Sequence, residues 1–253
     1  MHPIRVFRSH DEYYDRVFTL FIQSTDQKQQ AAAWLRDYLS RFPTNGLAID
    51  AGAGNGILTR HLADHFAEVL AVEPNPSLLA ELTASGANVR ILPETIEAAR
   101  LDEGQAELVF CSHVLYYVPR PAWDDLVRRM LSWIQPGGTL VVVLQAEDTD
   151  CMNFYKALRG HGFPITEFMN GMAQQPDVAS VHLVRQPSRI ACASDEELIM
   201  ILEFLANLTP FAEGERIPSQ DELHRLAKTV GRQEANGTVL SCDQLFCILT
   251  KPA

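Results

Sequence analysis

Between residues 47 and 144 the chain alternates short apolar runs with amphipathic helical patterns, and this alternation restricts the fold to a few α/β architectures. Apolar residues recur at helical spacing most clearly over residues 123–134. Strands that are apolar on both faces and separated by helices predict a parallel sheet covered on both sides. The strands are expected at residues 47–51, 69–72, 89–92, 108–111 and 139–144.

The segments on either side of this alternation are expected to complete the same domain. Two helical patterns precede it, separated by Ser24, Thr25 and Asp26, and a turn at 43–46 is expected to end this arm. Capping boxes opening at Ser194 and Ser219 predict two later helices. Apolar runs at 181–184 and 245–250 predict two further strands, and strands without a crossover helix favour an antiparallel edge.

We therefore expect three functional regions within one domain. Residues 1–42 are expected to form a helical arm or lid, residues 43–150 a ligand-binding core, and residues 151–253 a substrate-side cap with the closing helices and strands.

Composition limits the partners of the chain. Lys and Arg number 21 against 32 Asp and Glu, giving a formal charge of −11. Nucleic acids and anionic membranes require a basic face, so the sequence predicts neither as a partner and weakly favours cationic ones. No apolar run is long enough to cross a bilayer, and no signal peptide is recognisable. We expect a cytoplasmic protein, monomeric or homodimeric, with five buried, reduced cysteines.

No metal site is predicted. His61 and His65 are four residues apart, as zinc ligands on one helix face can be. However, there is no HExxH glutamate and no evident third ligand, so two helix-surface histidines are the favoured interpretation.

A glycine-rich bend follows the first expected strand. Gly52, Gly54 and Gly56 allow the backbone to turn tightly and to approach a ligand without a Cβ atom in the way. The spacing is not the GxGxxG of dinucleotide-binding folds, because Ile57 stands at the third glycine position, and no P-loop lysine follows. An ordinary strand-to-helix turn remains the alternative interpretation.

Two acidic residues follow the next strands. A carboxylate at Glu73 could accept hydrogen bonds from both ribose hydroxyls, and Glu94 follows the third strand, near where an adenine would lie. Both positions fall at carboxyl ends of neighbouring strands, where open parallel sheets bind ligands. The sequence thus predicts a nucleoside held without a phosphate clamp, with solvent-exposed charges as the alternative.

The DAGAGNG bend at residues 50–56, Glu73 and the QPGG turn at residues 135–138 together resemble motifs of class I S-adenosylmethionine-dependent methyltransferases. This resemblance implies a Rossmann-like fold with a mostly parallel seven-stranded sheet, helices on both faces, an antiparallel edge and a small substrate-capping region. It implies S-adenosylmethionine as cofactor, S-adenosylhomocysteine as product and no metal. The implied cofactor-binding residues are Asp50, Gly52, Ala53, Gly54, Gly56, Glu73, Pro74, Glu94, Thr95, Ile96, Ser112 and His113.

Three shorter segments, at residues 24–27, 113–118 and 239–249, resemble the histamine N-methyltransferase type within that class. The resemblance places substrate contacts at Asp26, His113 and Asp243. Asp26 keeps the acidic chemistry, whereas His113 and Asp243 stand where that family has amides. The implied substrate is therefore a small amine or nitrogen heterocycle, without histamine itself being specified.

Methyl transfer from a sulfonium needs alignment of three atoms and a nucleophile in its neutral form. His113 is the candidate base, because histidine gains and loses its proton near neutral pH. Asp26 and Asp243 are catalytic and substrate-binding candidates that would orient a cationic group. Tyr116 and Tyr117 could wall the pocket, since aromatic faces attract ammonium and sulfonium groups. A capping, packing or strand-end role is the structural alternative for each.

The leading function is therefore methyl transfer to the nitrogen of a small molecule. Methylation of an oxygen remains open, because His113 could serve either acceptor. A cyclase that consumes S-adenosylmethionine and releases methylthioadenosine would use the same cofactor site. A non-catalytic S-adenosylmethionine-binding protein is the third alternative.

Overall fold

The computed structural model describes residues 2–8, 11–40 and 46–253. The chain forms two compact units. The large unit comprises residues 28–144, 165–186 and 245–253, and the small unit comprises residues 1–27, 145–164 and 187–244. The boundary predicted between residues 42 and 43 lies outside the described residues.

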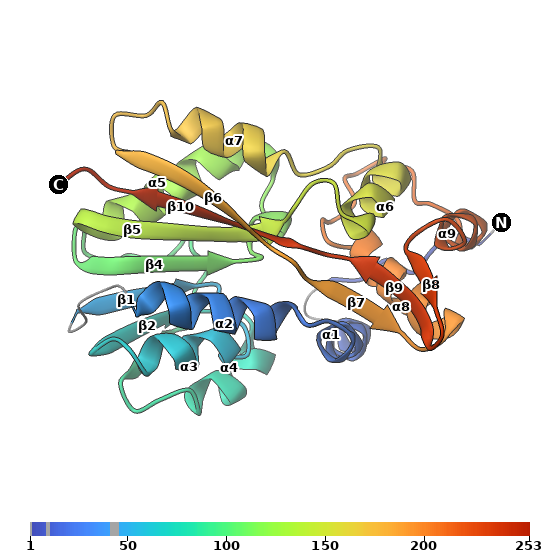
Figure 1. Cartoon of the computed structure of the whole chain (residues 1–253), viewed down its shortest axis with the longest axis horizontal. Coiled ribbons are helices and arrows are strands. Elements are labelled where there is room, and N and C mark those ends of the chain that lie inside the picture. Colours follow the sequence, from blue (N-terminus) through green and yellow to red (C-terminus); the bar gives the residue numbers. More distant parts are fainter. Residues whose placement is uncertain (1, 9–10, 41–45) are drawn as a thin grey trace. The chain divides into compact units, whose positions relative to one another are not determined.

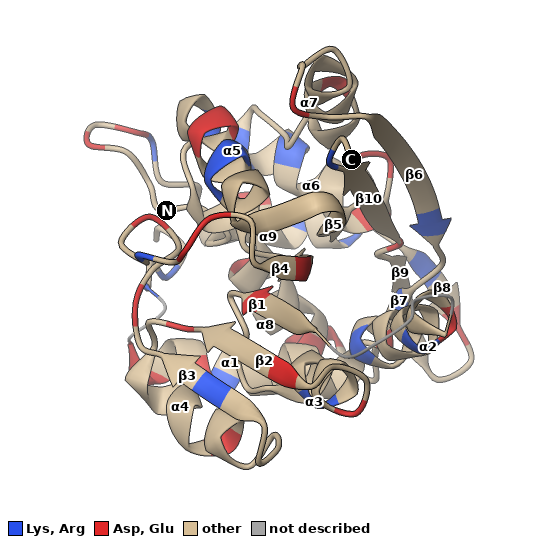
Figure 2. Ribbon diagram, turned by 90° about the vertical axis from the view of Figure 1, so that its left-hand side faces the viewer, with Lys and Arg blue, Asp and Glu red and all other residues tan. Residues whose placement is uncertain are grey.

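The large unit is built on a seven-stranded sheet with the order β3-β2-β1-β4-β5-β10-β6 (Figure 2). The four pairings among β3, β2, β1, β4 and β5 are parallel. β10 runs opposite to β5 and gives the sheet a mixed edge (Figure 1). The expected Rossmann-like architecture is confirmed. The strands are β1 (Leu47–Ala51), β2 (Glu68–Val72), β3 (Val89–Leu92), β4 (Ala106–Ser112), β5 (Ile134–Gln145), β6 (Ser180–Gln186) and β10 (Gln244–Thr250).

Helices cover both faces of this sheet. Apolar residues of α2 and α3 form one buried cluster with Leu108, Phe110 and Val141 of the strands. Successive strand residues point to opposite faces, and in both views α5 lies on the other side of the sheet from α2 and α3 (Figures 1 and 2). The helices are α2 (Gln27–Leu39), α3 (Ile57–Ala63), α4 (Pro76–Thr83), α5 (Trp123–Trp133) and α7 (Ile165–Met172), with 3-10 turns at Leu115–Tyr117 and Arg120–Ala122.

The QPGG segment differs from its local prediction. Proline and glycine were expected to separate a helix from a strand starting at residue 139, but α5 ends at Trp133 and β5 begins at Ile134. The N–H of Gly137 donates to the carbonyl of Pro252 over 3.1 Å, and the N–H of Lys251 donates to the carbonyl of Gly138 over 3.0 Å. Pairing with a segment more than one hundred residues away therefore extends the strand.

In the part that the structure describes, the small unit combines four helices with a three-stranded antiparallel sheet ordered β7-β9-β8. The capping boxes correctly predicted the starts of α8 and α9, where Ser194 and Ser219 accept hydrogen bonds from backbone N–H groups three residues on. All three strands of this sheet were missed. Its elements are α1 (Glu12–Ser24), α6 (Asp150–Arg159), α8 (Asp195–Ala206), α9 (Gln220–Ala227), β7 (Arg189–Cys192), β8 (Arg232–Glu234) and β9 (Gly237–Ser241).

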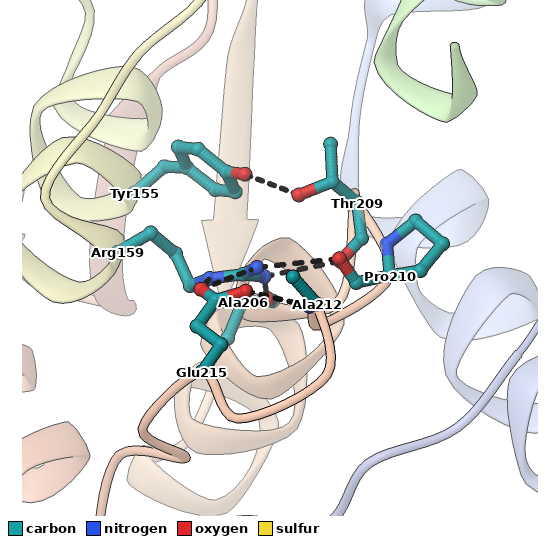
Figure 3. Close-up of polar contacts among 7 residues, drawn as sticks. All are labelled: Tyr155, Arg159, Ala206, Thr209, Pro210, Ala212 and Glu215. Atoms are coloured by element: carbon teal, nitrogen blue, oxygen red, sulfur yellow. Dashed lines mark hydrogen bonds and ion pairs between the residues drawn. The ribbon is translucent and has the colours of Figure 1, made fainter. Parts of the chain in front are cut away.

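Arg159 organises the loop that follows α8 (Figure 3). Its side chain, only 1% exposed, donates to the carbonyls of Ala206 and Thr209 over 2.7 and 3.0 Å and forms an ion pair with Glu215 at 2.9 Å. Its guanidinium also stacks on Phe211 at 3.7 Å from the ring centre. One buried cation thus satisfies carbonyls that the end of α8 leaves unpaired.

Within the ranges that the structure describes, no helix has both the length and the apolar character needed to span a bilayer.

Candidate functional site

Two glycines of the bend after β1 are required by close packing. The N–H groups of Gly52 and Ala53 both donate to the carbonyl of Val72, over 2.8 and 3.1 Å, which ties the bend to the end of β2. Gly52 has φ +86°, and a Cβ atom there would lie 2.2 Å from Val114 Cγ2. Gly56 has φ +77°, and its Cβ would lie 2.1 Å from Ser85 Oγ. A side chain at either position would displace its neighbours.

Gly54 lies at the centre of the bend and faces open space. Its φ is +57°, and a Cβ atom would have no heavy atom within 4 Å. Its N–H donates to Glu73 Oε2 over 2.8 Å, and the N–H of Asn75 donates to Glu73 Oε1 over 2.8 Å. Glu73 is 7% exposed. Each of its oxygens therefore has one backbone donor and retains capacity to accept another.

Asp50 lies near the carboxyl end of β1, buried below the bend. Its Oδ2 accepts a hydrogen bond from the Thr59 hydroxyl over 2.6 Å. Burial raises the pKa of Asp50 to about 6, because removal from water disfavours the charged form. The Thr59 hydrogen bond and the Lys28 ammonium act in the opposite direction, and the charge of Glu73 adds to the increase.

The next predicted residues follow the ends of β2, β3 and β4. Pro74, Glu94 and Thr95 are exposed, whereas Ile96 is buried. Ser112 ends β4, and its hydroxyl oxygen is buried without a hydrogen-bond partner among the described residues. A buried hydroxyl is normally hydrogen-bonded, so a ligand or a water molecule is expected to fill this position.

His113 has an unusual backbone conformation. It is the only non-glycine residue among those described with a positive φ, at 61°. Its N–H donates to the carbonyl of Val143 over 2.8 Å, and its ring stacks on Tyr116 with centroids 5.8 Å apart. Tyr116 is buried and Tyr117 is 43% exposed. Uncommon backbone conformations held by surrounding structure concentrate at functional sites.

The parallel strands thus bring most of the predicted residues to one edge of the large unit. Asp50 and the glycine bend lie at the end of β1, and Glu73 follows β2. Glu94 follows β3, and Ser112 and His113 lie at the end of β4. Adjacent parallel strands end at the same edge, so this follows directly from the strand order.

Asp26 and Asp243 belong to the small unit and meet at the start of β7. Asp26 Oδ1 accepts from the N–H of Arg189 over 2.7 Å, and Asp243 Oδ1 accepts from the N–H of Ser188 over 3.0 Å. Both acids therefore position two successive backbone amides. Their predicted contact with substrate stays a prediction.

Lys28 was not among the predicted site residues. It lies in the first turn of α2 and interacts electrostatically with Asp50. The sequence could have indicated this position, because Lys28 precedes Ala31, Ala32 and Leu35 at the spacing of one buried helix face.

The small unit also contains an open cleft of about 940 Å³. Within it, Glu203 accepts hydrogen bonds from the Tyr13 hydroxyl over 2.9 Å and the Arg5 N–H over 2.8 Å. Burial and the Glu203 hydrogen bond raise the pKa of Tyr13. The cleft contains none of the predicted site residues, and Glu203 holds the N-terminal segment within the small unit.

The cysteines lie inside the folded chain, and Cys151 interacts with Cys242 in the small unit. All five cysteines are buried and free, in agreement with their interpretation as small buried side chains. Across residues 2–8, 11–40 and 46–253, no group of three or more His, Cys, Asp and Glu side chains is arranged to hold a metal ion.

Residues 48–138 match a family model described as a methyltransferase domain. This segment of the chain is similar to methyltransferase domains. The match runs from β1 through the glycine bend, Glu73 and His113 to the QPGG segment.

A curated protein similar to this segment is malonyl-[acyl-carrier protein] O-methyltransferase from Enterobacter lignolyticus. It is 28% identical over 113 residues, which are 44% of this chain and 44% of that protein. The curated relatives that the chain matches are covered over 40 to 50% of their own length.

Solved structures support the methyltransferase fold. Phosphoethanolamine N-methyltransferase 2 of Haemonchus contortus, solved with S-adenosyl-L-methionine, has a TM-score of 0.60 and 15% identity over 97% of this chain and 59% of that one. A methyltransferase from Thermotoga maritima, described as a possible histamine N-methyltransferase, has a TM-score of 0.51 and 14% identity over 95% and 94%. The class I methyltransferase fold is confirmed, and the histamine N-methyltransferase type is not specifically supported.

Proposed function

We propose that the chain is an S-adenosylmethionine-dependent methyltransferase that methylates a nitrogen of a small amine or nitrogen heterocycle. The observation that carries the cofactor assignment is the pairing of Gly54 with Glu73. Gly54 leaves open space, and the buried Glu73 carboxylate beside it is held by two backbone donors. Two vicinal hydroxyls of a ribose would match its remaining acceptor capacity.

The other predicted cofactor contacts extend this assignment. Glu94, Thr95 and Ile96 would contact the adenine, and the Ser112 hydroxyl would gain its missing partner from the cofactor. Ala53 and Pro74 would flank the ribose. S-adenosylmethionine supplies the activated methyl group, and these residues hold its nucleoside.

The proposed reaction is a direct displacement. The nitrogen lone pair of the acceptor forms a bond to the methyl carbon while the carbon–sulfur bond breaks, and its electron pair remains on sulfur as a thioether. An acceptor that enters as an ammonium ion must first lose a proton, which His113 would accept. The positive φ of His113 fixes where its imidazole projects, so the strained backbone supports an assignment as the base.

Acceptor recognition is proposed for Asp26, Asp243, Tyr116 and Tyr117. Carboxylates and aromatic faces both favour a cationic acceptor, as does the net charge of −11. We retain a lid role for residues 1–42 and a cap role for residues 151–253. The proposal also includes a small-molecule acceptor and neither a nucleic acid nor a membrane as partner. It places the protein in the cytoplasm as a monomer or homodimer.

Incubation with methyl-labelled S-adenosylmethionine and a panel of amines, heterocycles, phenols and acids tests this proposal. We expect label in an N-methylated product with one equivalent of S-adenosylhomocysteine. Labelled oxygen products would instead establish the O-methyltransferase alternative, which the malonyl carrier-protein relative favours. A control without acceptor that accumulates methylthioadenosine would establish the cyclase. Tight binding without turnover of any acceptor would establish a non-catalytic binding protein.

A further inference from the structure

We infer that Trp123 is a positioning residue for the candidate base His113. Its indole N–H holds the 3-10 turn Leu115–Tyr117, and this turn keeps the Tyr116 ring against the imidazole. The inference rests on the proposed function, in which His113 accepts the proton of the acceptor, and it adds a residue that acts through its neighbours. All of these residues belong to the large unit.

The indole N–H of Trp123 joins the two ends of the segment that contains this turn. It donates to the carbonyl of Leu115 over 3.1 Å and to the carbonyl of Val118 over 3.0 Å. The turn's own hydrogen bond at this end, from the N–H of Val118 to the carbonyl of Leu115, is longer at 3.3 Å. Leu115 and Val118 are both buried, and a buried carbonyl needs a donor. The first residue of α5 therefore supports the turn through its side chain.

The indole ring is held in one direction by packing. Trp123 is 1% exposed and opens the buried stripe of α5, which Leu126 and Val127 continue at helical spacing. The rings of Trp123 and Phe168 meet edge to face, with centroids 5.4 Å apart. The Arg120 guanidinium lies over both rings, 5.0 Å from the Trp123 ring centre and 4.7 Å from that of Phe168. A ring packed in this way presents its N–H at a fixed point.

The turn connects the indole to the imidazole through Tyr116. The rings of Tyr116 and His113 are nearly parallel, with an angle of 17° between their planes and centroids 5.8 Å apart. The φ of 61° and the hydrogen bond to Val143 fix the backbone of His113, whereas the direction of its imidazole is set by side-chain contacts. An aromatic face also attracts the imidazolium that forms when His113 accepts a proton. The position of the turn therefore matters to the proposed proton transfer.

An isotope-edited NMR spectrum of the histidine rings in the full chain tests the positioning role without any turnover. The His113 signal is the one that His113→Asn removes, and Tyr116→Leu shows where this signal lies without the stacked ring. Trp123→Phe keeps an aromatic ring and removes the N–H donor. We expect it to move the His113 signal in the same direction as Tyr116→Leu does, because a neighbouring ring shifts the resonances of protons near its face.

Trp133→Phe is the matched control, since Trp133 is 2% exposed and ends the same helix that Trp123 begins. It removes the same N–H group at the opposite end of α5 and should leave the His113 signal in place. Thermal unfolding of both variants shows the temperature range in which each is folded. A His113 signal that stays in place in Trp123→Phe, or that moves equally in the two variants, would overturn the positioning role.

Turnover provides a second readout. Trp123→Phe should lower kcat by about 3- to 10-fold, the range for one neutral hydrogen bond, and should change S-adenosylhomocysteine affinity by less than about twofold. In a chain that already carries His113→Ala, the same substitution should lower kcat no further, because both residues act on one step. Independent, additive losses would overturn the positioning role. If His113→Ala keeps full activity while Trp123→Phe still moves the His113 signal, the proposed base is wrong and the hold of Trp123 on the ring stands.

Discussion

The bend after β1 contains Gly52, Gly54 and Gly56, and a side chain is excluded at these positions for two different reasons. At Gly52 and Gly56 a Cβ atom would overlap Val114 and Ser85, so packing of the fold excludes a side chain. At Gly54 nothing within the chain lies near the Cβ position. The sequence pattern predicted a ligand bend as a whole, but only the backbone angles and neighbours separate the residue that faces open space from the two that pack.

Gly54→Leu should abolish S-adenosylhomocysteine binding, with a loss of more than 100-fold, by filling the open space proposed to hold the nucleoside. Gly104→Leu is the matched control, because Gly104 also has a positive φ of +69° and open space around its Cβ. Both variants should lose about 1 kcal/mol of stability from the left-handed backbone. Calorimetric titration and urea unfolding measure the two effects, and wild-type affinity in Gly54→Leu would exclude this bend as the cofactor site.

His113→Ala should lower kcat by about 10²- to 10⁴-fold, the range for loss of a general base. Cofactor affinity should change by only a few-fold. His113→Asn is the control for the backbone, because asparagine tolerates the positive φ of this position and should keep more stability than alanine. Steady-state kinetics at neutral pH decide the matter, and full activity in either variant removes His113 as the base.

Asp50 should make the free energy of unfolding decrease as pH rises. Its folded-state pKa of about 6 exceeds the usual carboxyl value near 4, so between these values the folded chain holds more protons than the unfolded chain. From pH 5 to pH 8 the wild type should lose about 1 kcal/mol more stability than Asp50→Asn, which cannot titrate. Urea unfolding at both pH values measures the difference, and parallel losses in the two proteins would contradict the raised pKa.

At the scale of elements, most strands and capping boxes were predictable because their signals are local. β1 and β3 match their apolar runs to the residue. The strands of the small sheet were not predictable: β8 is exposed throughout and β7 alternates in only four residues, so neither produces an apolar run. The start of β5 was misplaced because hydrogen bonds from 251–252 override the helix-stopping composition of residues 136–138.

The loop after α8 should be the element most sensitive to a single substitution. Arg159→Met leaves the carbonyls of Ala206 and Thr209 and the Glu215 carboxylate without their cation, and we expect a loss of about 3–5 kcal/mol. Glu215→Gln should cost about 1 kcal/mol, because Arg159 keeps its carbonyl partners. Urea midpoints of the two variants test this order. Equal losses would mean that the ion pair, and not the carbonyl contacts, holds the loop.

For the molecule as a whole, the sequence predicted which strand ends lie side by side, while the cofactor and substrate roles of the residues at those ends stay predictions. The cofactor candidates follow from strand order, which a local pattern reveals. Asp26 and Asp243 carry backbone hydrogen bonds at the start of β7, a strand that the sequence did not predict. The net charge of the whole sequence is −11.

The net negative charge of the chain should make kcat/KM for a charged acceptor depend on salt concentration. For a cationic amine acceptor, kcat/KM should fall several-fold between low salt and about 0.5 M salt, because screening weakens the attraction of the whole chain for cations. A neutral heterocycle in the same assay is the control and should change less than twofold. Equal salt dependence for both acceptors would argue against electrostatic guidance.

The strand order also determines when the sheet can be completed during synthesis. β10 is the last strand of the large sheet to leave the ribosome, yet it lies between β5 and β6. Until residues 244–250 emerge, β6 has no neighbour to join and β5 keeps an uncovered edge. The nascent chain therefore lacks the strand that joins the edge strand β6 to the rest of the sheet, and folding of this sheet must finish after the final strand has been translated.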